Sequence, residues 1–218
     1  MNRRVLAVSI AVALAAVAVS LYVAGHPFIP EDATVERDVQ ATAWGPLALI
    51  FPFFSWIGDA KGFVLEVVIF IGVLIFNRGT WIVAAASSLS AGWYFLLAHL
   101  IIRPRPTTAQ VLRVTEHPGA SSYPSGHTIF IVTVVAVLML CFAYRFLPRR
   151  AWWAAWIVAA LIVAANGIDR IYTGAHWPTD VAGAILIAIA WLTFVVSFRA
   201  VSRRIIGSDV AQSGSSTQ

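Results

Sequence analysis

The sequence predicts an all-α membrane protein with six transmembrane helices, and three observations support this fold class. First, 60% of the 218 residues are hydrophobic and only 11% are charged, which is far too apolar for a soluble domain. Second, the chain divides into six apolar stretches, and a membrane-spanning helix needs about 20 mostly apolar residues. Third, arginines gather in alternate connecting segments, as expected when one set of loops faces the cytoplasm.

The first apolar stretch, residues 5–25, follows two arginines near the N-terminus. A cleaved signal peptide has the same order of basic residues and hydrophobic core. This stretch is longer than the usual core and lacks a clear cleavage site of small residues, so an uncleaved anchor is favoured. After an acidic segment, residues 44–56 are aromatic and interrupted by prolines, which is typical of chain that lies at the membrane interface.

The other five spans are expected at residues 62–76, 80–102, 128–147, 152–167 and 181–198. We find no internal repeat and no sign of a second domain, so residues 1–207 are expected to form one domain. The tail, residues 208–218, consists mostly of Ser, Gln and Gly. It is expected to be disordered because it has too little apolar surface to bury.

Arginines indicate the orientation of the spans in a bacterial-type cytoplasmic membrane. Six spans bring one group of arginines to the same side, and basic loops favour the cytoplasm. Both termini are therefore expected to be cytoplasmic, and the acidic loop, the segment 103–127 and the segment 168–180 are expected outside. The arginines of the cytoplasmic group are Arg3, Arg4, Arg78, Arg149, Arg150, Arg199, Arg203 and Arg204.

The same arginines account for the formal net charge of +5. A nucleic-acid surface would need a basic stripe on a soluble face, and the sequence offers none. The single cysteine, Cys141, lies in an apolar run and is expected to be a small buried hydrophobe. No Cys/His spacing suggests a metal site, so neither a metal nor another cofactor is expected.

Residues 169–180 carry an arginine, a histidine and two aspartates between two apolar runs. His176 and Asp180 are four residues apart, which would bring them to one face of a helix, and Pro178 suits the first turn of that helix. A carboxylate beside a histidine can fix its tautomer and stabilise the imidazolium. The alternative is an interfacial loop that holds one structural salt bridge.

Two further polar motifs begin or end apolar spans. Arg103-Pro104-Arg105-Pro106 ends the third span, and Pro124-Ser125-Gly126-His127 begins the fourth. A helix N-terminus with unpaired N–H groups favours anions, and His127 could donate a proton. Alone, each motif could be a lipid contact or a helix cap. Together with His176 they supply a nucleophile, an acid and cations, which is what phosphoryl transfer requires.

The three segments together resemble the type 2 phosphatidic acid phosphatases. That family has the motifs Lys-x6-Arg-Pro, Pro-Ser-Gly-His and Ser-Arg-x5-His-x3-Asp. The second motif is complete at residues 124–127. The third matches at Arg170, His176 and Asp180, but Asp169 replaces its leading serine. The first matches at Arg105-Pro106, but Ala98 replaces its lysine.

The resemblance implies an enzyme that removes phosphate from a membrane lipid phosphate or diphosphate without a metal, at an active site on the outer face. Implied substrates are polyprenyl diphosphate, phosphatidylglycerol phosphate and phosphatidic acid. By position, His176 would form a phosphohistidine, Asp180 would hold its imidazole, and His127 would protonate the leaving oxygen. The phosphoryl group would be bound by Arg105, Ser125, Gly126 and Arg170. Alternatives are a phosphotransferase with the same site and a non-catalytic lipid-binding or transport member.

The missing lysine leaves a cation to be supplied, because fixed positive charge strongly accelerates phosphoryl transfer. Arg103 and Lys61, the only lysine of the chain, are the two candidates, and we expect one of them to fill this role. Glu66, about a turn below the outer interface, is expected to be paired. Glu116 and His117 are expected to be solvated in their loop.

Overall fold

The computed structural model describes residues 1–58, 60–116 and 119–206, and every regular element in these ranges is helical. The all-α class is therefore confirmed. The expectations for His117 and for the tail 208–218 concern residues outside the described ranges.

Five helical segments are long and apolar enough to cross a membrane. A sixth apolar helix, α4 (Ala60–Phe76), has 17 residues and is shorter than these. Each of the six expected spans overlaps one of these helices. The five longer segments contain α1 (Arg3–Gly25), η2 and α5 (Arg78–Thr80 and Trp81–Leu100), α6, η3 and α7 (Gly126–Val137, Leu138–Ala143 and Tyr144–Phe146), η4 and α8 (Arg149–Ala151 and Trp152–Tyr172), and α9 (Pro178–Ser197).

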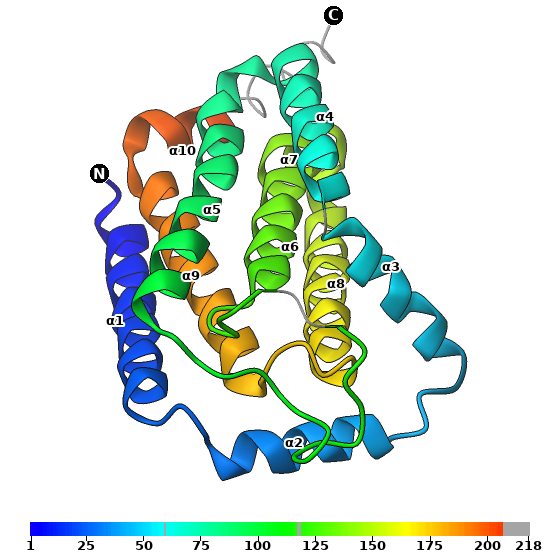
Figure 1. Ribbon diagram of the computed structural model, residues 1–218. Helices are drawn as coiled ribbons and strands as arrows, with labels where there is room; N and C mark the ends of the chain where they lie inside the picture. The colour runs from blue at the N-terminus through cyan, green and yellow to red at the C-terminus, as the bar shows by residue number, and fades with distance from the viewer. Residues whose placement is uncertain (59, 117–118, 207–218) are drawn as a thin grey trace, which may run out of the picture.

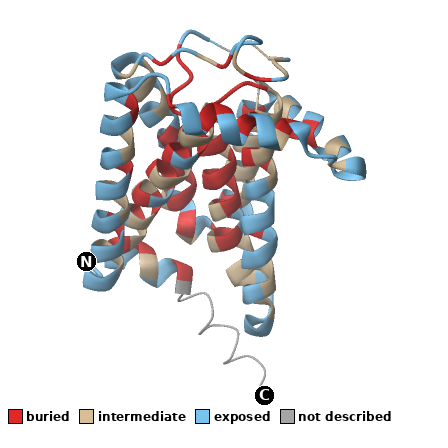
Figure 2. Cartoon of the chain, turned by 90° about the horizontal axis from the view of Figure 1, so that it is seen from below, coloured by how far each residue is buried: buried red, intermediate tan, exposed pale blue. Residues whose placement is uncertain are grey.

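Helix α6 lies in the middle of the bundle, where it contacts α5, α8 and α9, while α1 packs along α9. Buried residues accordingly gather on the central helices, and α1 is exposed over most of its surface (Figure 2). Its exposed side chains include Val8, Leu14 and Leu21. Large apolar side chains on the outside of a bundle are what a lipid environment favours.

Helix α2 (Pro30–Ala41) crosses one end of the bundle (Figure 1). Asp32, Glu36 and Gln40 are buried although they are polar. Their spacing of four residues brings them to one helix face, so α2 turns a polar face toward the bundle. The aromatic stretch that follows forms η1 (Gly45–Ile50) and α3 (Phe51–Ile57).

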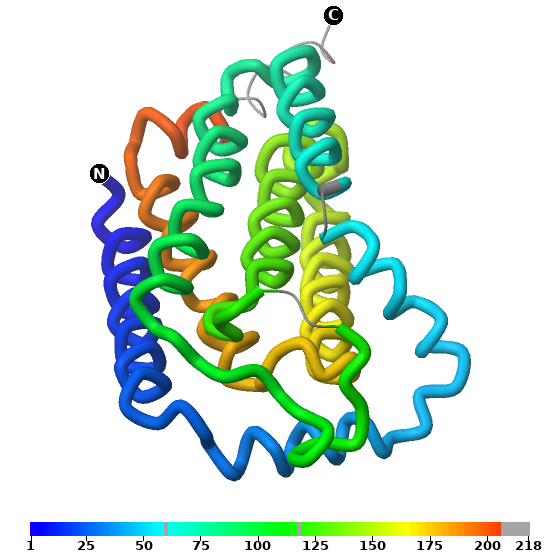
Figure 3. Tube along the Cα trace, viewed as in Figure 1, coloured from blue at the N-terminus to red at the C-terminus, as the bar shows by residue number. Residues whose placement is uncertain are grey.

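The two ends of the bundle differ in what they carry. The start of α1 and the short helix α10 (Arg199–Ile206) lie at one end, where the backbone N–H of Asn2 donates to the carbonyl oxygen of Ser197 at 2.7 Å. The other end, which we call the α2 end, carries α2, residues 101–116 and 119–125, and the turn between α8 and α9 (Figures 1 and 3). The polar motifs of the sequence therefore meet at the α2 end.

Helix α8 continues to Tyr172, beyond the end expected at residue 167. Asp169 and Arg170 are therefore on its last turn instead of in a boundary loop. Both side chains are fully buried and pair with each other. The pairing explains the difference, because charged residues can continue a helix when their charges are compensated.

We expect the α2 end to face away from the cytoplasm, because the basic loops lie at the opposite end. Reporter fusions after Arg78 and after Arg150 should read as cytoplasmic, whereas an accessible tag inserted beside Glu116 should read as external. A cytoplasmic signal from the Glu116 insertion would reverse the orientation and move the site to inner-leaflet lipids.

Candidate active site

A cavity of about 370 Å³ opens at the α2 end between α4, α5 and α6. It brings together four residues singled out from the sequence, and it also includes Glu66, whose carboxyl faces Ser87 and Ser88. The predicted residues in its wall are Arg105, Gly126, His127 and His176.

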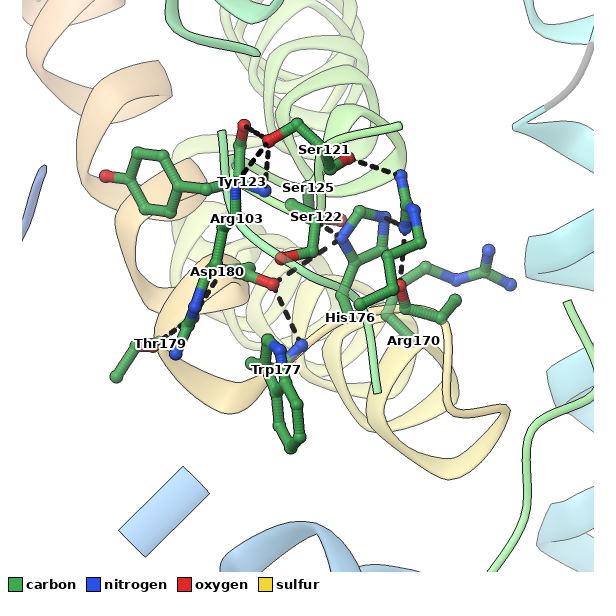
Figure 4. Close-up of polar contacts among 12 residues, drawn as sticks. Arg103, Ser121, Ser122, Tyr123, Ser125, Arg170, His176, Trp177, Thr179 and Asp180 are labelled. Atoms are coloured by element: carbon green, nitrogen blue, oxygen red, sulfur yellow. Dashed lines mark hydrogen bonds and ion pairs between the residues drawn. The ribbon is translucent and has the colours of Figure 1, made fainter. Parts of the chain in front are cut away.

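His176 lies in the tight turn between α8 and α9 and is only 2% exposed. The turn requires Gly174, which has φ of 71° and whose missing Cβ would overlap the carbonyl of Arg113. Nδ1 of His176 lies 2.7 Å from the carbonyl oxygen of Ser122 (Figure 4). Because a carbonyl only accepts, Nδ1 carries the proton, and Nε2 presents its lone pair 3.4 Å from Nη1 of Arg105. Burial lowers the pKa of His176, which favours this neutral form.

Asp180 does not share a helix face with His176, contrary to expectation, because α9 begins only at Pro178. Its Oδ2 lies 3.9 Å from Nδ1 of His176, which is too far for a hydrogen bond. The same oxygen accepts a hydrogen bond from the backbone N–H of Trp177 at 2.9 Å. The Ser122 carbonyl therefore holds the imidazole, and Asp180 acts on it through charge. A backbone acceptor of this kind has no signature in the sequence.

Arg103 does not line the cavity, which corrects its assignment as an additional phosphate-binding cation. It is fully buried, with Nη1 at 2.5 Å from Asp180 Oδ1 and Nη2 at 2.7 Å from Asp32 Oδ2. Nε donates to the carbonyl oxygen of Pro27 at 3.0 Å. These acceptors hold the guanidinium, so it is not in a position to bind an anion in the cavity.

Lys61, the other candidate for the missing cation, is exposed and also lies outside the cavity wall. Its Nζ sits 4.7 Å from the centre of the Trp56 ring, a cation–π arrangement. The structure therefore brings neither proposed substitute for the lysine to the cavity.

Arg170 is fully buried on the last turn of α8 and points away from the His176 ring (Figure 4). Nε donates to Asp169 Oδ2 at 2.7 Å, Nη1 lies 2.8 Å from Glu116 Oε2, and Nη2 contacts the hydroxyl of Ser55. Glu116 is thus half-buried and paired with Arg170, whereas the sequence suggested that it would be solvated. Although burial would raise the pKa of Glu116, Ser55 and Arg170 hold it below its ordinary value.

Helix α6 begins at Gly126, and Ser125 is its N-cap, which is the alternative to the phosphate-binding role expected for it. The Ser125 hydroxyl accepts a hydrogen bond from the backbone N–H of Thr128 at 3.4 Å and is buried, so it serves the helix and does not line the cavity. His127 lines the cavity from the first turn of α6. Gly58 packs against the His127 ring so closely that a Cβ at residue 58 would overlap it.

Glu36 is a buried carboxyl that the motifs did not reveal. It is fully buried on α2, where Oε1 accepts from Nε2 of Gln40 at 3.4 Å. Burial, together with the neighbouring carboxylates of Asp180 and Asp32, raises the pKa of Glu36 to about 9, although Arg103 opposes this. Glu36 is therefore neutral near pH 7. Within the described ranges, no group of three His, Cys, Asp or Glu residues could hold a metal ion.

Residues 79–204 match the family model of the PAP2 superfamily. The bacitracin transport permease protein BcrC of Bacillus licheniformis is 33% identical over 97 residues, which cover 44% of this chain and 43% of that protein. Phosphatidylglycerophosphatase B of Bacillus subtilis is 28% identical over 145 residues, or 64% and 69% of the two chains. Undecaprenyl-diphosphatase BcrC of Bacillus subtilis is 30% identical over 96 residues, or 44% and 45%. The chain thus spans less than half the length of two of these relatives.

Two crystal structures have a similar fold. The PAP2 type phosphatidylglycerolphosphate phosphatase of Bacillus subtilis aligns with a TM-score of 0.71 over 87% of this chain and 94% of that one, at 20% identity. LpxE of Aquifex aeolicus aligns with a TM-score of 0.57 over 76% and 94%, at 25% identity.

Glu36 generates a prediction about pH and stability. Its carboxyl keeps a proton in the folded protein up to about pH 9 but loses it near pH 4.5 when exposed. Unfolding therefore releases a proton, so the contribution of Glu36 to stability falls as pH rises between these values. Glu36→Gln removes this pH-dependent contribution to stability. The thermal unfolding midpoint of the variant should therefore rise relative to that of the wild type as pH rises from about 5 to 8.5.

The matched control is Glu31→Gln, on the exposed face of the same helix, which should keep the pH dependence of the wild type. A difference between Glu36→Gln and the wild type that stays constant with pH would contradict a neutral buried carboxyl.

Proposed function

Because the chain belongs to the PAP2 superfamily, we propose that it is a membrane enzyme that hydrolyses a lipid phosphate or diphosphate through a phosphohistidine. One observation carries the proposal. The Nε2 lone pair of His176 lies beside Arg105 in a cavity that also contains His127. This arrangement provides a nucleophile, a cation and a second proton-transfer group in one cavity.

In the first step, Nε2 of His176 attacks the terminal phosphorus while the bond from that phosphorus to the leaving oxygen breaks. The leaving oxygen is the ester oxygen of a lipid phosphate or the bridging oxygen of a lipid diphosphate. His127 gives its proton to that oxygen. In the second step, His127 takes a proton from water, and the resulting hydroxide attacks phosphorus, releasing phosphate and restoring His176. The Nδ1 hydrogen bond to Ser122 keeps the ring oriented in both steps. Asp180 stabilises the positive charge of the phosphohistidine ring from 3.9 Å.

The phosphoryl oxygens would be bound mainly by Arg105 and by the N-terminus of α6. Arg105 is held by the carbonyl oxygens of Ala175 and Ser121 at 2.5 and 2.7 Å, which fixes its guanidinium beside the nucleophile. The backbone N–H of Gly126 lies at a helix start that favours anions. Arg170 would join them only by exchanging Glu116 for a phosphoryl oxygen, because Glu116 now occupies its Nη1.

The walls of the cavity support a lipid substrate. Phe63 on α4 and Phe95 on α5 line it, yet they are 72% and 60% exposed. The cavity therefore extends to the apolar outer surface of the bundle between these two helices. An acyl or polyprenyl chain could remain among lipids there while its phosphate reaches His176. We propose undecaprenyl diphosphate, phosphatidylglycerol phosphate and phosphatidic acid as the first substrates to test, from the outer leaflet.

The direct test is phosphate release from these three lipids by the purified protein in excess EDTA. We expect the wild type to be active and His176→Ala to lose about 10³-fold in kcat, because it removes the nucleophile. Asp180→Asn should lose only about 10- to 100-fold, since Asp180 acts through the imidazole. His99→Ala is the matched control, because His99 is exposed and does not line the cavity.

Two results would refute this mechanism. One is substantial turnover by His176→Ala, which would exclude a phosphohistidine at this residue. The other is wild-type activity that EDTA abolishes and Mg²⁺ restores at the catalytic step.

A second prediction follows from the close packing of Gly58 against His127. Gly58→Ala should push the imidazole out of place and lower kcat by roughly 10²-fold, because small misplacements of a catalytic group are costly. Gly92→Ala is the control, since a Cβ at residue 92 meets no atom within 4 Å. Equal rates for the two variants would argue against His127 as the acid.

A further inference from the structure

Arg103 is shared between two carboxylates that come from distant parts of the chain. Nη1 contacts Oδ1 of Asp180 on α9, and Nη2 contacts Oδ2 of Asp32 on α2. Arg103 and Asp180 are fully buried and Asp32 is 3% exposed. Asp32 also accepts from the backbone N–H and the hydroxyl of Thr179 at 3.0 and 2.6 Å. A helix outside the region matched by the family model is thus joined to the first turn of α9.

We infer that Asp32 is a positioning residue of the active site: it holds one arm of Arg103, so that Arg103 binds a single oxygen of Asp180 and leaves the other oxygen facing His176. The inference rests on the proposed hydrolysis, because it assigns Asp32 an effect on that reaction. Asp32 does not line the cavity, so it acts through Arg103 and Asp180.

The geometry of arginine explains why Asp32 is needed. A guanidinium prefers to bind a carboxylate with two parallel N–H donors. Here Nη2 is engaged by Asp32, so the Asp180 Oδ2 atom is left to the Trp177 N–H and to the charge of His176. Without Asp32, Nη2 would turn to Oδ2 and draw the carboxylate away from the imidazole.

Charge leads to the same conclusion. Asp32 and Asp180 contribute two negative charges and Arg103 one positive charge, so the buried group carries −1 while Glu36 is neutral. His176 becomes cationic when Nε2 bonds to phosphorus, and a nearby buried negative charge stabilises that state. Loss of the Asp32 charge leaves the pair of Arg103 and Asp180 neutral, which removes this stabilisation.

The test compares Asp32→Asn with Asp38→Asn, which makes the same change on the exposed face of α2. Both are assayed for phosphate release with the full-length protein, and thermal unfolding checks that each is folded. We expect Asp32→Asn to lose about tenfold or more in kcat, with KM within twofold, because substrate does not touch Asp32. Asp38→Asn should match the wild type.

The double variant Asp32→Asn/Arg103→Gln separates positioning from simple structural support. It removes the cation that would otherwise pair fully with Asp180, so it should recover at least threefold in kcat over Asp32→Asn alone. The inference would be overturned if the double variant showed the sum of the losses of the two single variants. It would also be overturned if Asp32→Asn and Asp38→Asn had equal kcat.

Arg103→Lys provides an independent test if Asp32→Asn does not fold. Lysine keeps the charge but lacks the fork that holds both carboxylates, so kcat should fall about tenfold at unchanged KM. Wild-type kcat in this variant would also overturn the inference. Absence of phosphate release by the wild type and Asp38→Asn alike would instead refute the proposed function.

Discussion

The α2 end of the bundle depends on the burial of one guanidinium, that of Arg103. Removing an arginine from water is costly unless carboxylates and carbonyls replace its hydration. Asp32, Asp180 and the carbonyl oxygen of Pro27 do so here. Because these partners come from α2, from α9 and from the segment before α2, satisfying one side chain fixes three parts of the chain against each other. Oδ2 of Asp180 lies 3.9 Å from Nδ1 of His176, so the turn that carries His176 rests against this assembly.

Arg105 and Arg170, which the sequence motifs predict at one phosphate site, differ in the groups that hold them. Arg105 is held by carbonyl oxygens, which carry no net charge, so its positive charge remains available in the cavity. Arg170 is held by the carboxylates of Asp169 and Glu116, which cancel its charge. The departure from the family motif at residue 169 therefore has an electrostatic consequence, because a serine there would leave one carboxylate fewer on Arg170.

Much of the architecture follows from local sequence patterns. The apolar helices, the Ser125 cap and the place of Pro178 in the first turn of α9 depend on near neighbours, and the described residues show each of these features. The burial of Arg103 could not be predicted, because its partner Asp32 lies 71 residues away in a segment without a motif. Ser122 holds the His176 ring through its backbone carbonyl. Every residue has this group, so no sequence pattern could indicate it. Helix α8 continues past Gly167 because Asp169 and Arg170 pair with each other, and hydropathy alone does not reveal such a pair.

The packing of α1 against α9 also has a consequence for biosynthesis. Ser9 donates to the carbonyl oxygen of Ala190 at 2.9 Å, and the backbone N–H of Asn2 donates to the carbonyl oxygen of Ser197, so α1 packs against a helix that is synthesised much later. Until α9 has been synthesised, Ser9 lacks the carbonyl to which it donates in the folded protein. Asp32 likewise lacks its partners Arg103 and Thr179 until those residues have been synthesised. The α2 end therefore cannot be completed until α9 has been made, and a nascent chain arrested before α9 would lack Thr179 and Asp180, the partners of Asp32 and Arg103.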